Sequence, residues 1–193
     1  MTRLSLKQIA QSGATNGQVP GWSTAAGMWV PTTVSGGGGG GGYATGVRQV
    51  VYATLGTQAF SGSNIPFDNT IPQISEGFEI LTVSITPQSI TSNLYVLAIA
   101  NISCSQVATG ALALFRDSTA NAYGVASTAV LTANTSENLS VIAMIPSGST
   151  SASTIRLRGG ANGGNLYVNG SAAGGQTFGG RFATSLMVME VGA

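Results

Sequence analysis

The amino-acid sequence predicts an all-β protein: an antiparallel two-sheet jelly-roll sandwich, preceded by an extended N-terminal segment and a poly-glycine linker. After residue 43, apolar residues recur with a period of two, as in strands that bury one face. Clusters of Pro, Asn, Asp and Gly separate these runs and supply the dihedrals of turns. No stretch has the 3.6-residue apolar period of a helix. About eight short strands in a body of this length favour a sandwich or a jelly roll.

The strands are predicted from this alternation in chain order. It is clear at Leu81, Val83 and Ile85, and it continues through the longest apolar run, residues 94–102. It is weaker in residues 122–130 and ends at Leu186 and Val188. The predicted strands are 47–54, 81–85, 94–102, 112–114, 122–130, 139–145, 155–157 and 186–190. The glycine-rich residues 162–180 are predicted to form a long, polar surface loop.

Seven consecutive glycines at residues 36–42 divide the chain. Glycine loses the most backbone entropy on ordering, so this tract is either a flexible tether or is held by neighbouring chains. The predicted organisation is an N-terminal docking segment at 1–35, a poly-glycine linker at 36–42 and a jelly-roll domain at 43–193.

The composition limits the classes of function. Only 7% of residues are charged and 43% are hydrophobic, so we expect extra apolar surface to be buried between subunits of an oligomer. The longest apolar stretch is shorter than the roughly 20 residues of a membrane-spanning helix, and residues 1–10 lack a secretion signal pattern, so we expect synthesis in a cytosol and no membrane insertion. The net charge of +1, from scattered basic residues, disfavours nucleic acid as a partner.

Catalysis is not expected. The chain has six acidic residues and no histidine, and its single cysteine, Cys104, lies in an apolar run. Glu76 and Glu79 are the one close pair of acids, and we interpret them as solvated charges beside a turn rather than as glycosidase carboxylates. Arg116 and Asp117 are interpreted as a local ion pair at a strand end. The sequence therefore predicts no catalytic residue, no cofactor and no metal site.

Four apolar residues of the N-terminal segment are candidate docking anchors. Thirty-five residues cannot bury a core of their own, and aromatic side chains contribute much of the binding energy at interfaces. The anchors are Trp22, Met28, Trp29 and Val30. The alternative is that they pack on the body of their own chain.

Two further groups are candidate contact residues in the body. Arg156 and Arg158 alternate with core positions, so their guanidinium groups are predicted to project from the face away from the core. There they either lie at the symmetry axis of an oligomer, meet acids of a neighbouring subunit such as Glu190, or are exposed to solvent. Aromatic rings and amides in the predicted loop have the composition of a sugar site, although such residues also occur simply as turn residues. The candidates for this receptor-facing loop are Asn162, Asn165, Tyr167, Asn169 and Phe178.

Several segments resemble bacteriophage virion proteins. The run GATNGQV at 13–19, Trp22 and the run GMWVP at 27–31 resemble a virion-proximal module of phage tail and fibre proteins. The runs IPFDNTIPQ at 65–73 and ALFRDS at 113–118, with Glu76-Gly77, resemble the C-terminal domain of phage fibre and spike proteins. That resemblance implies a trimeric jelly roll of the tumour-necrosis-factor type.

The expected function follows from this resemblance. It implies a non-enzymatic virion protein, a homotrimeric tail or head fibre or spike. The N-terminal segment would dock on other phage structural proteins, in the capsid or tail, and the jelly roll would meet a glycan or protein of the host surface. The alternatives are a capsid decoration protein or head fibre that stabilises the capsid, and a lectin-like bacterial binding module.

Overall fold

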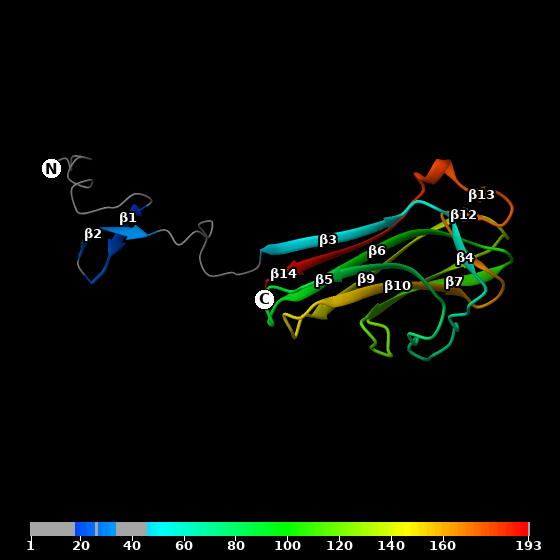
Figure 1. The fold of residues 1–193 in the computed structure, drawn as a ribbon, viewed down its shortest axis with the longest axis horizontal. Coiled ribbons are helices and arrows are strands. Elements are labelled where there is room, and N and C mark those ends of the chain that lie inside the picture. The colour runs from blue at the N-terminus through cyan, green and yellow to red at the C-terminus, as the bar shows by residue number, and fades with distance from the viewer. Residues whose placement is uncertain (1–17, 26, 34–45, 193) are drawn as a thin grey trace. The chain divides into compact units, whose positions relative to one another are not determined.

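Strands make up most of the protein in the computed structural model, which describes residues 18–25, 27–33 and 46–192 (Figure 1). The chain divides into two compact units, Met1–Gly42 and Tyr43–Ala193. The predicted poly-glycine linker, residues 36–42, lies outside the described residues. So do residues 13–17, the first five of the GATNGQV run. The described residues of each unit form their own β structure.

The described part of the first unit is a β-hairpin. Strand β1 (Gln18–Ser23) pairs antiparallel with β2 (Met28–Thr33), and Gly27, at a φ of 62°, lies in the turn between them. A positive φ is strained for other residues and easy for glycine. These residues are extended within each strand, and the turn reverses the chain and places Trp22 directly opposite Trp29.

The second unit is a sandwich of two antiparallel sheets, and the predicted all-β sandwich is confirmed. The pairing is nested: β3 pairs with β14, β5 with β10, β6 with β9 and β7 with β8. The main strands are β3 (Val47–Leu55), β5 (Phe78–Ile85), β6 (Asn93–Cys104), β7 (Ala108–Arg116), β8 (Gly124–Val130), β9 (Glu137–Pro146), β10 (Ser153–Ala161) and β14 (Thr184–Val191).

Two more pairings complete the sheets. Strand β14 also pairs with β6, and β10 also pairs with β7. The four-stranded sheet has the order β5-β10-β7-β8; the six-stranded sheet contains β3-β14-β6-β9 and two short strands, β11 (Leu166–Val168) and β4 (Ala59–Ser61). Nested pairs of eight strands divided between two sheets are the arrangement of a jelly roll.

The core lies between the two sheets and follows the predicted alternation. Leu94, Val96 and Ala98 of β6 are fully buried and face buried side chains of the four-stranded sheet such as Leu114 and Leu157. Burial of each large aliphatic side chain stabilises the fold by about 1.5–3 kcal/mol. Cys104 is a buried free thiol of this core.

Residues 162–180 do not form the single polar loop predicted from their glycines. Leu166 and Val168 of β11 are fully buried, and β11 pairs with the end of β6 on one side and with β4 on the other. Strands β12 (Gly170–Ser171) and β13 (Gly175–Gln176) then form a small hairpin. The sequence signal was misleading because three alternating residues surrounded by glycine are too few to stand out as a strand.

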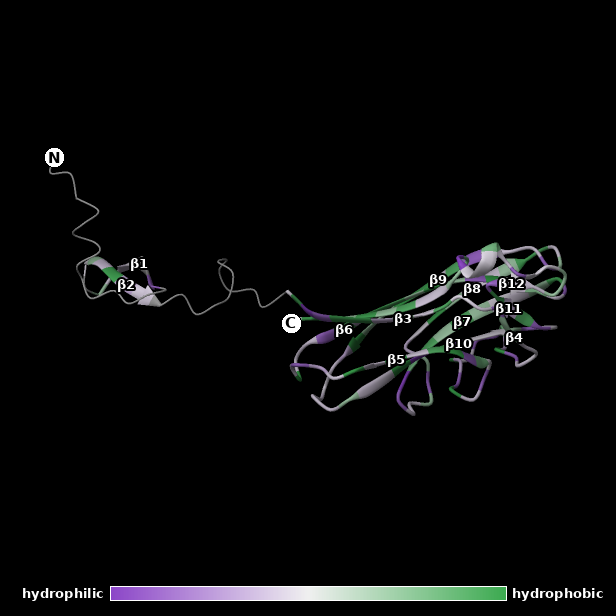
Figure 2. Ribbon diagram, turned by 45° about the horizontal axis from the view of Figure 1, so that its top comes forward, coloured by the Kyte–Doolittle hydropathy of each residue, from purple (hydrophilic) through white to green (hydrophobic). Residues whose placement is uncertain are grey.

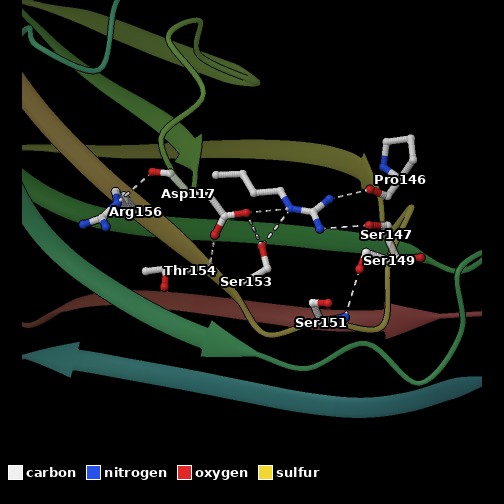
Figure 3. Close-up of polar contacts among 9 residues, drawn as sticks. Asp117, Pro146, Ser147, Ser149, Ser151, Ser153, Thr154 and Arg156 are labelled. Carbon is white, nitrogen blue, oxygen red and sulfur yellow. Dashed lines mark hydrogen bonds and ion pairs between the residues drawn. The ribbon is translucent and has the colours of Figure 1, made fainter.

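A polar network joins the two sheets at one end of the sandwich (Figure 3). The Arg116 guanidinium, at the end of β7, donates to the carbonyl oxygens of Pro146, the last residue of β9, and Ser147, which follows it, at 2.7 and 2.8 Å. It also donates to Ser153 Oγ of β10 at 2.7 Å. Ser153 Oγ and the Thr154 N–H in turn donate to the Asp117 carboxylate, at 2.9 and 2.8 Å. The Arg116–Asp117 ion pair is present at 3.5 Å.

The buried carboxylate of Glu190 extends this network. It accepts hydrogen bonds from Gln49 Nε2 at 2.6 Å, Ser92 Oγ at 2.5 Å, the Gln88 N–H at 2.9 Å and the Ser89 N–H at 3.1 Å. Burial alone would raise the pKa of Glu190, but these bonds together favour the charged form and hold its pKa below the ordinary value. The carboxylate thus fixes the β5–β6 connection against β3 and β14.

Replacement of Glu190 by Gln tests this role, because Gln has the same shape but presents an NH₂ group to donors. We expect Glu190→Gln to lower the free energy of unfolding at pH 7 by roughly 2–3 kcal/mol, since buried donors lose a charged acceptor. The measurement is urea unfolding of both proteins.

The same experiment has a pH dependence with a defined sign. A pKa lowered by folding stabilises the folded protein above the ordinary glutamate value of 4.5, and this contribution is lost as the pH falls through the folded-state pKa. The difference between the two proteins should therefore shrink below pH 4.5. Glu137→Gln, outside the network, is the control, and an equal effect of both variants at pH 7 would contradict the assignment.

Candidate functional site

The outer faces of the two sheets differ in chemistry. The outer face of the four-stranded sheet carries charge: Arg156 pairs with Glu79 at 2.6 Å. Part of the same face is covered by the β4–β5 connection, whose Ile65 packs on Ala113 and Phe115. Polar and charged groups in contact with water suit an outer surface.

The outer face of the six-stranded sheet is apolar. In its four main strands, the residues that alternate with the core positions are again mostly aliphatic, aromatic or methionine side chains. Figure 2 shows white and green along most strands of the sandwich, with purple concentrated in loops and at strand ends. We call this surface the apolar face; it consists of Val50, Tyr52, Tyr95, Leu97, Ile99, Ile142, Met144, Met187 and Met189.

The strand register arranges these residues in rows across the sheet. Met187 lies between Tyr52 and Leu97, and Leu97 lies opposite Ile142. The neighbouring row is formed by Val50, Met189, Tyr95 and Met144. Tyr52 is 74% exposed and Ile142 53%, whereas the central-strand members of these two rows are half-buried: Tyr95, Leu97, Met187 and Met189. Such contiguous apolar surface typically marks an interaction site.

The residues of this face are not among the contact residues predicted from the sequence. The sequence does contain a sign of the apolar face in residues 94–102. There Tyr95, Leu97 and Ile99 are apolar, and so are the core residues that alternate with them. A strand that is apolar on both faces is expected to be covered on both. That four such strands lie side by side is visible only in the folded chain.

The predicted inter-subunit residues make contacts within their own chain. Arg158 donates to the carbonyl oxygens of Glu76 and Gly77, at 2.8 and 2.7 Å, and Arg156 pairs with Glu79. Both guanidinium groups leave the core face, as predicted. Glu190 is fully buried, so its predicted role as a partner for a neighbour's arginine is wrong: its hydrogen bonds within the chain enclose it.

Two of the five predicted receptor-facing residues are buried. Asn169 is 0% exposed: its Nδ2 donates to the carbonyl oxygens of Leu55 and Thr57, and its Oδ1 accepts from Thr184 Oγ1. Tyr167 is covered by the ring of Phe60, stacked at 4.9 Å between centroids. The receptor-facing prediction is wrong for these two, because β11 belongs to the sheet.

The other three candidates of that group remain accessible without forming one site. Phe178 is 76% exposed and contacts Phe182 edge-to-face, and Asn162 is exposed. Asn165 is half-buried, and its N–H donates to Ser105 Oγ. The predicted constellation of aromatic rings and amides around one sugar is therefore not present.

The predicted anchors lie on the hairpin. The Trp22 and Trp29 rings pair edge-to-face at 5.7 Å and remain 55% and 53% exposed. Met28 is exposed and Val30 is half-buried. The anchors are thus arranged by cross-strand pairing, which holds the rings at the surface with little conformational freedom.

The described ranges hold neither a metal-binding cluster nor a membrane-spanning helix. No three His, Cys, Asp or Glu side chains among these residues come together as a metal site would need. No helix in the described ranges has both the length and the apolar character that a bilayer span requires.

Comparison with known proteins gave distant likenesses in fold. No protein-family model matches the chain, and no curated protein matches it. A structure of infectious bursal disease virus, Gx strain, aligns with 91% of this chain and 42% of its own at a TM-score of 0.34 and 15% identity. The VP2 subviral particle of that virus aligns with 91% of this chain and 43% of its own, at a TM-score of 0.30 and 14% identity. The enzymatically active domain of tailspike protein 4 of bacteriophage CBA120 aligns with 77% of this chain and 20% of its own, at a TM-score of 0.23 and 15% identity. The chain spans less than half the length of each of these proteins.

Asn169→Ala tests the structural role of the buried amide. We expect the free energy of unfolding to fall by roughly 2–4 kcal/mol, because three hydrogen-bonded groups lose their partner and Asn169 has a φ of 62°, which is strained for alanine. Asn162→Ala, which removes one exposed acceptor, should cost less than about 1 kcal/mol. Urea unfolding measures both, and equal losses would contradict the role.

Tryptophan fluorescence tests the exposure of the hairpin, because the two tryptophans of the chain are both in it. We expect iodide to quench most of the emission of the native protein, since both rings are about half exposed. The comparison is the same protein unfolded in urea. Native emission that iodide does not quench would show that the rings are covered.

Proposed function

We propose that this chain is a non-enzymatic structural protein of a bacteriophage particle, a homotrimeric fibre or spike located on the virion. Its N-terminal hairpin docks on other structural proteins of the particle, and its jelly roll meets the host surface. The resemblance of residues 13–31, 65–77 and 113–118 to phage fibre and spike segments supports the virion role. The jelly-roll strand order agrees with the domain type which that resemblance implies.

The apolar face is the observation that carries the proposal of assembly. It holds aliphatic, aromatic and methionine side chains in a row-by-row array, in a chain that is only 7% charged. The nine residues of the apolar face include no charge that a charged partner could pair with. An equally apolar surface therefore fits this face best. The same face of a second and a third copy supplies that surface and removes it from water in every subunit. The number three comes from the resemblance.

The hairpin supports the proposal of docking. Residues 18–33 contain no charged residue, and the paired rings of Trp22 and Trp29 offer a rigid aromatic surface. Aromatic anchors of this kind concentrate binding energy in a small area. An uncharged hairpin fits an apolar site on the particle, and the hairpin belongs to a different compact unit of the chain from the strands of the apolar face.

Leu97→Glu tests assembly through the apolar face. We expect the unchanged full chain to have the mass of a trimer by light scattering after size separation. The variant should be a monomer at the same concentration, because burial of an unpaired carboxylate between subunits costs several kcal/mol. The Leu97 side chain is only half-buried in the isolated subunit, so circular dichroism should be unchanged.

Ser84→Glu is the matched control. It places the same charge at an exposed position of β5, in the other sheet, and should leave the trimer intact. A monodisperse monomer for the unchanged chain would overturn the proposal of assembly. A trimer for Leu97→Glu would show that the subunits meet elsewhere.

A further inference from the structure

A second surface of the jelly roll lies on the opposite side from the apolar face. The segment between β4 and β5 crosses the outer side of β7 and β8 and leaves an open groove of about 300 Å³ beside it. We call it the Phe67 groove; the residues that matter here are Phe67, Asp68, Thr70, Ile71, Val125 and Ser127. Its volume is at the small end of the range of about 300–1,000 Å³ for ligand sites.

Backbone contacts hold the groove in shape. The Ile74 N–H donates to the Ala120 carbonyl at 2.8 Å, and the Ala122 N–H donates to the Pro72 carbonyl at 3.0 Å. Ile65 is buried against β7, and its backbone nitrogen would lie 2.7 Å from a Cβ placed on Gly160. The segment therefore packs closely on the sheet, and a ligand would bind without having to order it.

Most of the groove surface is apolar, with one accessible aromatic ring. Phe67 is 67% exposed, and Ile71 and Val125 are also exposed. No other element among the described residues covers the Phe67 ring. A flat apolar ring facing open space can stack on the C–H face of another ring.

The polar groups lie beside this ring. One oxygen of Asp68, Oδ1, accepts from the Thr70 N–H at 2.7 Å and from Thr70 Oγ1 at 2.6 Å, which fixes the carboxylate. No described residue donates to the second oxygen, Oδ2. The bonds from Thr70 also lower the pKa of Asp68, so the carboxylate is charged at neutral pH. The hydroxyl of Ser127, exposed on β8, lies in the same groove.

This chemistry discriminates between classes of ligand. A pyranose ring has one apolar face of C–H groups and hydroxyls at its edge, which match an aromatic ring beside a carboxylate acceptor. A charged acceptor makes the stronger hydrogen bonds to hydroxyls. A sugar acid would bring a second negative charge next to Asp68, and it is therefore disfavoured.

We propose that the Phe67 groove binds a single neutral pyranose residue of a surface glycan, with Phe67 stacked on the ring and Asp68 Oδ2 accepting from its hydroxyls. This inference rests on the proposed adhesive function. It assigns that function to the four-stranded sheet, away from the predicted residues at 162–178.

The test is saturation-transfer difference NMR on the full chain. The probes are the methyl pyranosides of glucose, galactose, mannose and N-acetylglucosamine, with methyl glucuronide as the acidic comparison. We expect at least one neutral probe to bind with the strongest transfer to its C–H face, and the glucuronide to bind more weakly. Binding of none of the neutral probes, or preferred binding of the glucuronide, would overturn the proposal.

Two variants place the sugar in the groove. Phe67→Ala and Asp68→Asn should each weaken binding by about tenfold, through loss of stacking and of a charged acceptor respectively. Asn at position 68 retains an Oδ1 acceptor for Thr70, so the local turn is kept. Phe178→Ala removes an equally exposed ring elsewhere and should leave binding unchanged; loss of binding in this variant alone would overturn the assignment to the groove.

Light scattering of the same samples separates this inference from the proposed function. Trimers in which no neutral pyranoside binds would overturn the sugar site and leave the assembly intact. Monomers whose binding of a neutral pyranoside is lost in Phe67→Ala would support the sugar site and contradict the trimer.

Discussion

The structure depends on one constraint: the central strands β6 and β14 are apolar on both faces. Burial of one face against the four-stranded sheet builds the sandwich core from residues such as Val96 and Leu186. The other face, with Leu97 and Met187, then remains at the surface of the isolated subunit. The hydrophobic effect acts on both faces alike, so the force that folds the subunit also favours the association proposed above.

Charge is rare in this chain, and Arg116, Asp117 and Glu190 hold one end of the sandwich together. The Arg116 guanidinium joins the end of β9 to β7 and β10, and the Glu190 carboxylate joins β3 and β14 to the connection before β6. The buried Glu190 carboxylate accepts from neutral donors, and none of the described cations pairs with it. Hydrogen bonds of this kind specify one arrangement, because a wrong register would leave a buried charge unpaired.

The jelly roll separates its surfaces by sheet. The apolar face lies on the outer side of the six-stranded sheet, and the Phe67 groove lies on the outer side of the four-stranded sheet. A trimer formed through the first, as proposed, leaves the second open to solvent in every copy. Three weak sugar sites on one particle component would then act together, and such multivalency raises overall avidity without any new contact.

Much of the fold follows from the sequence, because alternation of apolar residues is a local property. The eight main strands and the core positions of β6 and β9 could be predicted from this period. The short strands could not: Leu166 and Val168 form β11 only because the end of β6 and β4 lie on either side. The hairpin around Gly27 was missed for a similar reason, since cross-strand pairing of Trp22 and Trp29 is not a feature of either residue alone.

The sequence by itself determined the class of fold, the alternation of buried residues and the scarcity of charge, because these depend on residue type and spacing. The tertiary structure decided which side chains meet. It buried Asn169 and Glu190, which the sequence placed at contact surfaces, and it collected the apolar face and the Phe67 groove from strands far apart in the chain. The physical reason is that a sheet brings together residues by pairing and register, and these are set by the packing of the whole sandwich rather than by any single strand.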